Sequence, residues 1–442
     1  VRPATNGNDL SNANLRFGNG TDARFVINGT TPDTQYEQPN VVGTVNLTGA
    51  DLVFSTSNAF VPTAGQTFTI INNDEADAIT GTFNGLSQGA TINNFLGGSL
   101  NATISYTGGT GNDVVITVQA APLPDYRITT TNNAIIITDI SGNGETLDVS
   151  ESGSNISFNV AGRTFSLDGG ATTAFPADVA LADISSITIN AEGGNDIINF
   201  GAFTQILPTL TVNGGIGNDR VYFEGDITFA ANANLDLDLQ NDDANPGEDG
   251  GFFEDDIDLR LSGSGAVIIK VNTQFLTGDN TTLETVNGDI TIEGNQQAVP
   301  NLNAGRIIIS NSTFRSTGSG NISFKSKTFN NSADGVVLWG TTVSTQSGHI
   351  NLQGDVTGNR AIDLSNSNIT TAGGNIVLQG TSSAVYGFDM SRSVVSAGGM
   401  GTVNITGQGQ SYGVLMIKST ITSAGGDVAV SGTATAGTGI NL

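Results

Sequence analysis

Gly348-His-Ile-Asn-Leu-Gln-Gly354 and Gly374-Asn-Ile-Val-Leu-Gln-Gly380 are two copies of one pattern, in which a glycine turn precedes alternating apolar and polar residues. Four further copies begin at Gly288, Gly320, Gly401 and Gly426. The successive spacings from glycine to glycine are 32, 28, 26, 27 and 25 residues. Alternation with a period of two predicts a strand with one buried face, and a repeat of this length predicts stacked structural units.

Each repeat contains two more short strands, such as Gly387-Phe-Asp-Met390 and Ser393-Val-Val-Ser396. One unit of three strands cannot bury its own apolar face, whereas stacked units pair each strand with its equivalent one coil later. We therefore expect the strand from Ile376 to lie on the strand from Ile350. The predicted fold is all-β, with a right-handed, three-sided parallel β-helix (a solenoid) in the C-terminal half and β-rich structure before it.

Three regions follow from the pattern along the chain. Residues 1–119 are predicted to be a β-rich segment, and residues 120–185 a small antiparallel β unit that begins with the proline-containing linker Ala120-Ala-Pro-Leu-Pro-Asp125. Residues 186–442 are predicted to be the solenoid, with an acidic insertion at 241–256. The first and last residues match neither a signal peptide nor a completed repeat, so we expect a mature fragment or an internal piece of a longer protein.

Composition narrows the possible partners. The chain has 15 Lys and Arg against 41 Asp and Glu, a formal charge of −26, which disfavours nucleic acid and anionic membrane surfaces. No apolar run approaches the roughly 20 residues that cross a bilayer. The sequence has no cysteine, so a thiol nucleophile is excluded. It has a single histidine, His349, so a Ser-His-Asp triad that does not use this residue is excluded as well. These features predict a protein outside the cell or on its surface.

Two segments carry a resemblance to known proteins. Residues 22–118, with Val45-Asn-Leu-Thr-Gly-Ala-Asp-Leu52 and Gly81-Thr-Phe-Asn-Gly-Leu-Ser-Gln-Gly-Ala90, resemble a segment of giant bacterial surface proteins and autotransporter-like passengers. Residues 286–442 resemble the β-helix of the filamentous-haemagglutinin class. The resemblance implies an adhesin, matrix component or surface fibre whose partners are copies of itself or neighbouring surface proteins, and it brings no catalytic residues with it.

Three glycine-rich turns are similar to the calcium-binding nonapeptide of tandem β-roll repeats. They are Gly108-Gly-Thr-Gly-Asn-Asp113, Gly193-Gly-Asn-Asp196 and Gly214-Gly-Ile-Gly-Asn-Asp219. Tandem repeats share each ion between the loops of neighbouring coils. Here the copies are isolated, so plain Gly-Asn-Asp turns are the alternative. Calcium is the cofactor that we expect, with Asp113, Asp196 and Asp219 as ligands.

The acidic insertion is a second candidate for calcium, because dense carboxylates repel one another unless a hard cation neutralises them. Its spacing is partly similar to an EF-hand loop, although Glu248 stands where a glycine is needed. A solvated acidic loop is the alternative. The candidate ligands are Asp242, Asp243, Asp249, Glu254, Asp255 and Asp256.

His349 occupies the repeat position that Asn321 and Asn375 hold in other coils, so we expect a turn residue in a short ladder of stacked side chains. Trp339, Tyr386, Phe388 and Tyr412 are candidates for a carbohydrate-binding strip, although aromatic residues of a β-helix more often fill its core.

We expect the chain to be a non-enzymatic structural or adhesive segment. Two alternatives remain open. A self-assembling filament or sheath subunit has the same repeats. A polysaccharide-degrading β-helix enzyme has the same architecture, since fold does not define function. Against an enzyme, the motif set of polygalacturonase-like hydrolases is absent from the sequence.

Overall fold

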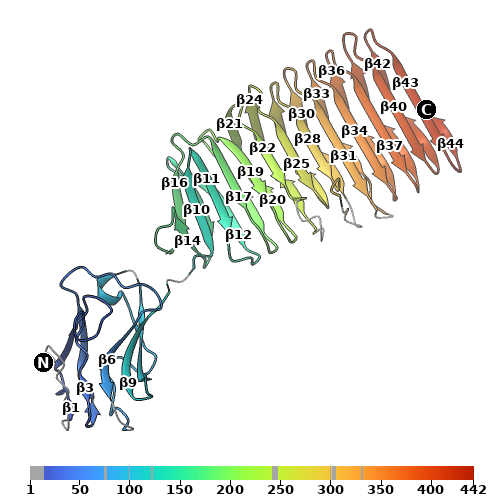
Figure 1. Ribbon diagram of the computed structural model, residues 1–442. Helices are drawn as coiled ribbons and strands as arrows, with labels where there is room; N and C mark the ends of the chain where they lie inside the picture. Colours follow the sequence, from blue (N-terminus) through green and yellow to red (C-terminus); the bar gives the residue numbers. More distant parts are fainter. Residues whose placement is uncertain are drawn as a thin grey trace. The chain divides into compact units, whose positions relative to one another are not determined.

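The computed structural model describes residues 14–73, 77–98, 100–120, 123–240, 247–298, 300, 305–329 and 332–442. Two compact units make up the chain, Val1–Leu123 and Pro124–Leu442, and each has a hydrophobic core of its own. The structure confirms an all-β protein in which a parallel β-solenoid accounts for most of the chain (Figure 1). Helix is limited, among the residues described, to the single turn η1 (Phe95–Gly97).

The first unit is itself a short solenoid. Its strands β1, β2 and β3 pair in parallel with β4, β5 and β6, so two coils are stacked. An antiparallel sheet then closes the unit, because β9 pairs with both β6 and β8. The bounds are β1 Leu15–Arg16, β2 Asp22–Val26, β3 Asn40–Val41, β4 Val45–Asn46, β5 Asp51–Ser55, β6 Thr67–Asn73, β7 Thr91–Ile92, β8 Ala102–Gly108 and β9 Asp113–Val118.

The second unit begins with strands that run against the first coil. Strand β10 pairs antiparallel with β11, and β13 pairs antiparallel with β12, while β11 and β12 pair in parallel with β17 and β18 of the next coil. We call residues 124–185 the cap. Its strands are β10 Tyr126–Thr131, β11 Ala134–Asp139, β12 Thr146–Ser152, β13 Asn155–Val160, β14 Thr164–Leu167, β15 Thr173–Ala174 and β16 Ala177–Ala180. The antiparallel segment expected at 120–185 is therefore continuous with the solenoid sheets, and the chain divides after Leu123.

Three parallel sheets form the sides of the solenoid. The first sheet contains β17 Ser186–Asn190, β19 Thr209–Asn213, β22 Leu235–Asp238, β25 Val267–Val271, β28 Ile290–Gly294, β31 Ile322–Thr328, β34 Ile350–Val356, β37 Ile376–Ser382, β40 Val403–Gly409 and β43 Val428–Ala434. As predicted, Ile376 pairs in register with Ile350 and Leu378 with Leu352.

The second and third sheets complete each coil. The second contains β18 Ile197–Phe200, β20 Arg220–Phe223, β23 Gly250–Phe253, β26 Gln274–Thr277, β29 Arg306–Ser310, β32 Val336–Trp339, β35 Arg360–Ser365, β38 Tyr386–Ser391, β41 Tyr412–Ile417 and β44 Thr438–Asn441. The third contains β21 Ile227–Ala231, β24 Asp258–Ser262, β27 Thr282–Thr285, β30 Thr313–Ser316, β33 Thr342–Thr345, β36 Asn368–Thr371, β39 Val394–Ala397 and β42 Thr420–Ser423.

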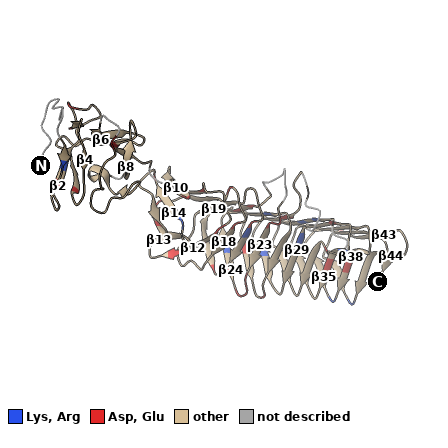
Figure 2. Ribbon diagram, turned by 90° about the horizontal axis from the view of Figure 1, so that it is seen from below, with Lys and Arg blue, Asp and Glu red and all other residues tan. Residues whose placement is uncertain are grey.

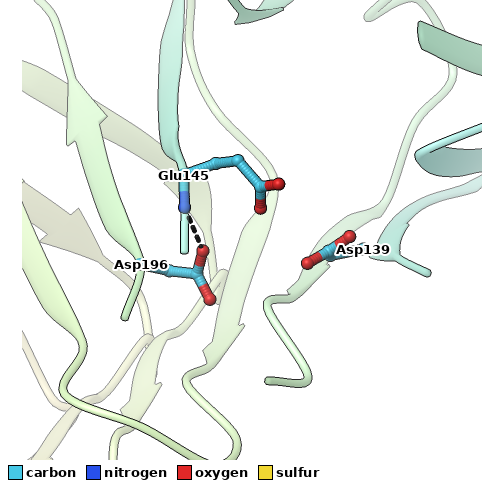
Figure 3. Close-up of side chains that lie close together, drawn as sticks. All are labelled: Asp139, Glu145 and Asp196. Atoms are coloured by element: carbon cyan, nitrogen blue, oxygen red, sulfur yellow. Dashed lines mark hydrogen bonds between the residues drawn. The ribbon is translucent and has the colours of Figure 1, made fainter. Parts of the chain in front are cut away.

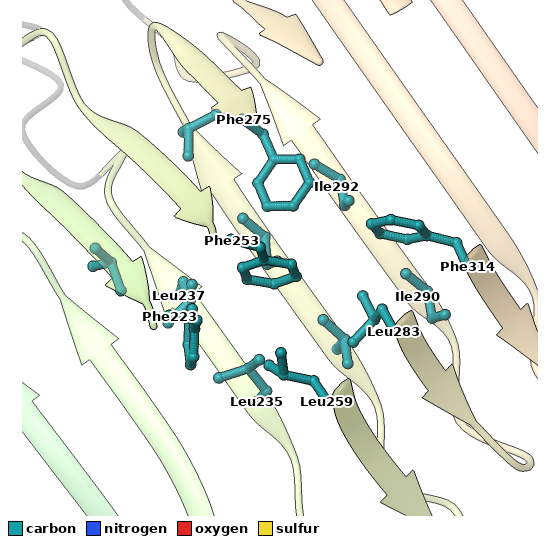
Figure 4. Close-up of a cluster of buried hydrophobic side chains, with 14 of the residues drawn as sticks. Phe223, Leu235, Leu237, Phe253, Leu259, Phe275, Leu283, Ile290, Ile292 and Phe314 are labelled. Carbon is teal, nitrogen blue, oxygen red and sulfur yellow. The ribbon is translucent and has the colours of Figure 1, made fainter. Parts of the chain in front are cut away.

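Aromatic rings from successive coils fill the interior (Figure 4). Phe223, Phe253 and Phe275 belong to neighbouring strands of the second sheet, and their ring centroids are 5.1 Å apart at each step, in edge-to-face contact. This geometry is favourable because the positive edge of one ring meets the negative face of the next. The core is therefore a column of interlocked side chains.

Candidate metal centre

Three predicted acidic ligands occupy one corner of the solenoid, two from the Gly-Asn-Asp turns and one from the acidic insertion. Asp196, Asp219 and Asp249 each stand directly before a strand of the second sheet, in three consecutive coils. All three are buried. Asp249, expected in an irregular insertion, is thus the equivalent of Asp219, and the residues that follow it form the regular strand β23.

These carboxylates form a ladder along the corner. The backbone N–H of Asp196 donates to Oδ1 of Asp219 over 2.9 Å, and the N–H of Asp219 donates to Oδ1 of Asp249 over 2.7 Å. The N–H of Asp249 in turn donates to Oδ1 of Asn272 over 2.7 Å. Each side chain thereby satisfies a backbone donor that no strand reaches. The glycines permit the close stacking, since a Cβ at Gly217 would lie 1.4 Å from the carbonyl oxygen of Gly194.

At the cap end, the ladder meets two further carboxylates. Asp139 ends β11 and Glu145 precedes β12, and with Asp196 they form a cluster whose ligand oxygens all lie within 4.8 Å of one another. We call Asp139, Glu145 and Asp196 the acidic triad (Figure 3). The backbone N–H of Glu145 donates to Oδ1 of Asp196 over 2.9 Å, which fixes the two turns against each other.

Two oxygens of the acidic triad are buried without a partner. Oδ1 of Asp139 accepts from the N–H of Ser141 over 2.7 Å, but Oδ2 of Asp139 and Oδ2 of Asp196 have no hydrogen-bond partner among the described residues. The residues Asp139 and Asp196 are 2% and 4% exposed. An unsatisfied buried carboxylate oxygen is costly, so both atoms retain unused capacity to accept a hydrogen bond or to bind a cation.

The electrostatics of the triad agree with this geometry. Burial raises the pKa of Asp196 to about 7, and the charges of Asp219, Asp139 and Glu145 act in the same direction. Burial and the Asp139 charge likewise raise the pKa of Glu145 above its usual range. Arg163 neutralises part of the charge, because its Nη2 lies 2.6 Å from Oε1 of Glu145. One guanidinium beside three carboxylates leaves an excess of negative charge.

The structure does not bring the other predicted ligands to this centre. Asp113 belongs to the first unit, where its carboxylate accepts from the N–H groups of Asn73 (2.8 Å) and Thr110 (3.2 Å) and so stabilises a turn. Glu254, Asp255 and Asp256 are exposed in the turn at the far end of β23 from Asp249. The predicted ligands Asp242 and Asp243 lie outside the described residues.

Sequence reasoning missed Asp139 and Glu145. The sequence contained one signal that could have found Glu145. Gly142-Asn143-Gly144-Glu145, in the cap, is similar to the Gly-Asn-Asp turns that end at Asp196 and Asp219, because glycine and asparagine again precede an acidic residue. An open hollow in the surface lies at this corner, and its lining contains residues that directly precede Glu145 and Asp196. It is lined by Gly142, Asn143, Gly144, Gly194, Asn195, Ile216 and Gly217.

His349 is a turn residue, as expected. Its backbone N–H donates to Oδ1 of Asn321 over 2.8 Å, and its Nδ1 accepts from the backbone N–H of Asn375 over 2.9 Å, so the ladder at this position joins each side chain to the backbone of the next coil. Of the four aromatic candidates, Phe388 is fully buried. Trp339 is 49% exposed at the end of β32, and Tyr386 and Tyr412 contact each other on adjacent coils at 5.3 Å between centroids.

Comparisons with models of protein families, with curated proteins and with solved structures found no match for this chain. The class that the fold defines is architectural: a three-sided parallel β-solenoid with an antiparallel cap. Within the described residues, no helix has the length and apolar character required for a membrane span.

Proposed function

We propose that this chain is a non-enzymatic structural or adhesive segment of a large bacterial surface protein, located outside the cell. The observation that carries the proposal is one unbroken in-register row of buried apolar residues in the first sheet: Ile290, Ile322, Ile350, Ile376 and Val403. A stack in which each coil contacts only its neighbours makes an extended scaffold. The resemblance to autotransporter-like passengers and filamentous-haemagglutinin β-helices supports the extracellular assignment.

The surface chemistry supports a role without catalysis. Asp139 and Asp196 of the acidic triad are buried, which is unfavourable for direct contact with a substrate. A second hollow, on the third sheet, is lined by Ser, Thr, Gln and Ala side chains with Arg315, and it contains no pair of carboxylates for acid–base work. Charged residues are sparse over the strands of the solenoid (Figure 2).

Electron microscopy of the purified full chain, together with antibody labelling of intact source cells, tests this proposal. We expect single bodies that include a narrow, uniform shaft, and labelling of cells that have not been permeabilised. Long regular fibres would favour the filament or sheath subunit instead. Labelling only after permeabilisation contradicts the surface assignment, and release of reducing or unsaturated ends from polysaccharides contradicts the non-enzymatic one.

Carbohydrate is the adhesive ligand that we propose, bound over Trp339. The exposed indole offers a face on which a sugar ring can stack, and its ring N–H is hydrogen-bonded to Asp363, which is buried beside Arg360. The net charge of −26 favours neutral over acidic sugars. Because Trp339 is the sole tryptophan, its fluorescence reports binding directly. Neutral oligosaccharides should shift or quench this emission, and an unchanged spectrum across such a set contradicts the proposal.

A further inference from the structure

From the acidic triad we infer that a calcium ion binds between Asp139, Glu145 and Asp196 and locks the cap onto the first coil of the solenoid. The inference does not depend on the proposed function. It rests on two separate observations, the convergence of three carboxylates from two stacked turns and the presence of unpartnered, buried oxygens within that cluster.

The location gives the ion a structural task. Asp139 and Glu145 belong to the cap, whereas Asp196 belongs to the first regular coil, and their turns are adjacent along the corner. A cation held by all three oxygens would join the two segments at the point where antiparallel pairing changes to parallel stacking. Oδ1 of Asp139 and Oδ1 of Asp196 are already occupied by the N–H groups of Ser141 and Glu145, so Oδ2 of each remains for the ion.

The surroundings of the triad leave charge for a cation to neutralise. The Tyr126 hydroxyl donates to Oε2 of Glu145 over 3.3 Å, and Nη2 of Arg163 lies 2.6 Å from Oε1. The carboxylate of Glu145 would therefore bind the ion while it also contacts these two groups. Asp219 lies behind Asp196 in the ladder and adds a further negative charge. Asp125, which also pairs with Arg163, draws part of the guanidinium charge away from Glu145.

Calcium fits this cluster better than magnesium because of its coordination habits. Ca²⁺ accepts irregular coordination completed by water and backbone carbonyls, whereas Mg²⁺ demands near-ideal octahedral geometry. Three carboxylates from two stacked turns, with their ligand oxygens within 4.8 Å of one another, form an irregular set of this kind.

Calorimetric titration of the chelator-treated full chain with CaCl₂ tests the site, and each variant isolates one part of it. Asp139→Asn and Asp196→Asn should each weaken calcium binding at least tenfold, whereas Asp355→Asn, an exposed position on β34, should leave the affinity unchanged. Mg²⁺ should bind at least tenfold more weakly than Ca²⁺. Absence of binding at millimolar calcium, equal affinity in the Asp139→Asn variant, or preference for Mg²⁺ overturns the inference.

Thermal melting separates a ligand from a merely structural side chain. Asn at position 139 keeps an oxygen for the Ser141 N–H and removes one charge from the triad. In calcium, the unmodified chain should therefore melt several degrees above the Asp139→Asn variant. In chelator this order should be lost or reversed, because the carboxylates then repel one another. A variant that melts lower by the same amount in both solutions contradicts calcium binding by Asp139.

Discussion

At the scale of single residues, the solenoid buries carboxylates in its second sheet as well as at the acidic triad. Asp363 and Asp389 are in register on neighbouring coils, and Arg360 contacts Asp363 closely and Asp389 at 3.8 Å. Burial, aided by the charge of Asp363, raises the pKa of Asp389 to about 6. One guanidinium therefore serves two carboxylates, and the second remains poorly compensated.

The raised pKa of Asp389 predicts a pH dependence of stability. In the folded state this group holds its proton up to about pH 6, whereas in the unfolded chain it releases the proton near the ordinary aspartate pKa of 3.8. Its effect on stability is thus most favourable below pH 4 and is lost as the pH rises through 6. We expect Asp389→Asn to raise the free energy of unfolding by roughly 1–3 kcal/mol at pH 7.5 and by little at pH 4.

Chemical denaturation at the two pH values measures this difference. Asp355→Asn is the matched control, because it makes the same change at an exposed position, and its stability difference should be equally small at both pH values. A gain from Asp389→Asn of the same size at pH 4 and pH 7.5 would show that the protonation state of Asp389 is unrelated to stability.

The acidic triad could be predicted only in part from the sequence. The Gly-Asn-Asp turns led to Asp196 and Asp219, but as candidate ligands of isolated loops. The ladder that joins them depends on stacking, which a motif of nine residues does not contain. Asp139 lies 57 residues before Asp196, in a cap without the repeat, so no periodic pattern linked the two.

At the scale of elements, one turn position recurs with a left-handed backbone in successive coils. The residues at this position include Asn366 (φ 51°), Arg392 (φ 47°) and Lys418 (φ 51°), each shortly before a strand of the third sheet. Asparagine tolerates this conformation, whereas a long side chain is strained by contact between its Cβ and the backbone. The turns at Arg392 and Lys418 therefore adopt the same left-handed conformation as the turn at Asn366, at a higher conformational cost.

Replacing Arg392 by asparagine should relieve that strain. We expect Arg392→Asn to stabilise the chain by about 0.5–1 kcal/mol, visible as a higher melting temperature. The matched control is Arg127→Asn, the same substitution at an exposed position within β10, where asparagine is unfavourable and no gain is expected. Equal effects at the two positions would remove the conformational explanation.

The strands of the repeat were predictable because each places apolar residues on one face with a period of two. The sequence gives weaker information on the first unit, whose six parallel strands include three of only two residues, too short to show alternation. Likewise β23 was hidden by the acidic residues around it, although Phe252 and Phe253 pair in register with Tyr222 and Phe223. In both places stacking on a neighbouring coil, and not local pattern, makes the strand.

At the scale of the whole molecule, the two units have separate hydrophobic cores. Phe68 belongs to the core of the first unit and Phe275 to that of the second, and both are fully buried. Loss of a buried phenylalanine side chain costs about 3–5 kcal/mol. We therefore expect Phe68→Ala to destabilise the first unit alone and Phe275→Ala the second alone.

Scanning calorimetry combined with limited proteolysis follows the two units independently. Phe68→Ala should lower the temperature at which residues 14–120 become sensitive to protease and leave the solenoid unit unchanged, and Phe275→Ala should do the reverse. A single transition that both substitutions shift by the same amount would mean that the units unfold as one.

The in-register coils also determine how the solenoid unit would respond to pulling. A coil at the end of the stack pairs with one neighbouring coil only, so a load applied along the stack can detach coils one at a time from that end. Gly348 and Gly374 are 26 residues apart, so each detached coil would add roughly 90 Å of extended chain to the length of the protein. We therefore expect the solenoid unit to lengthen in steps under load and to refold coil by coil when the load is removed.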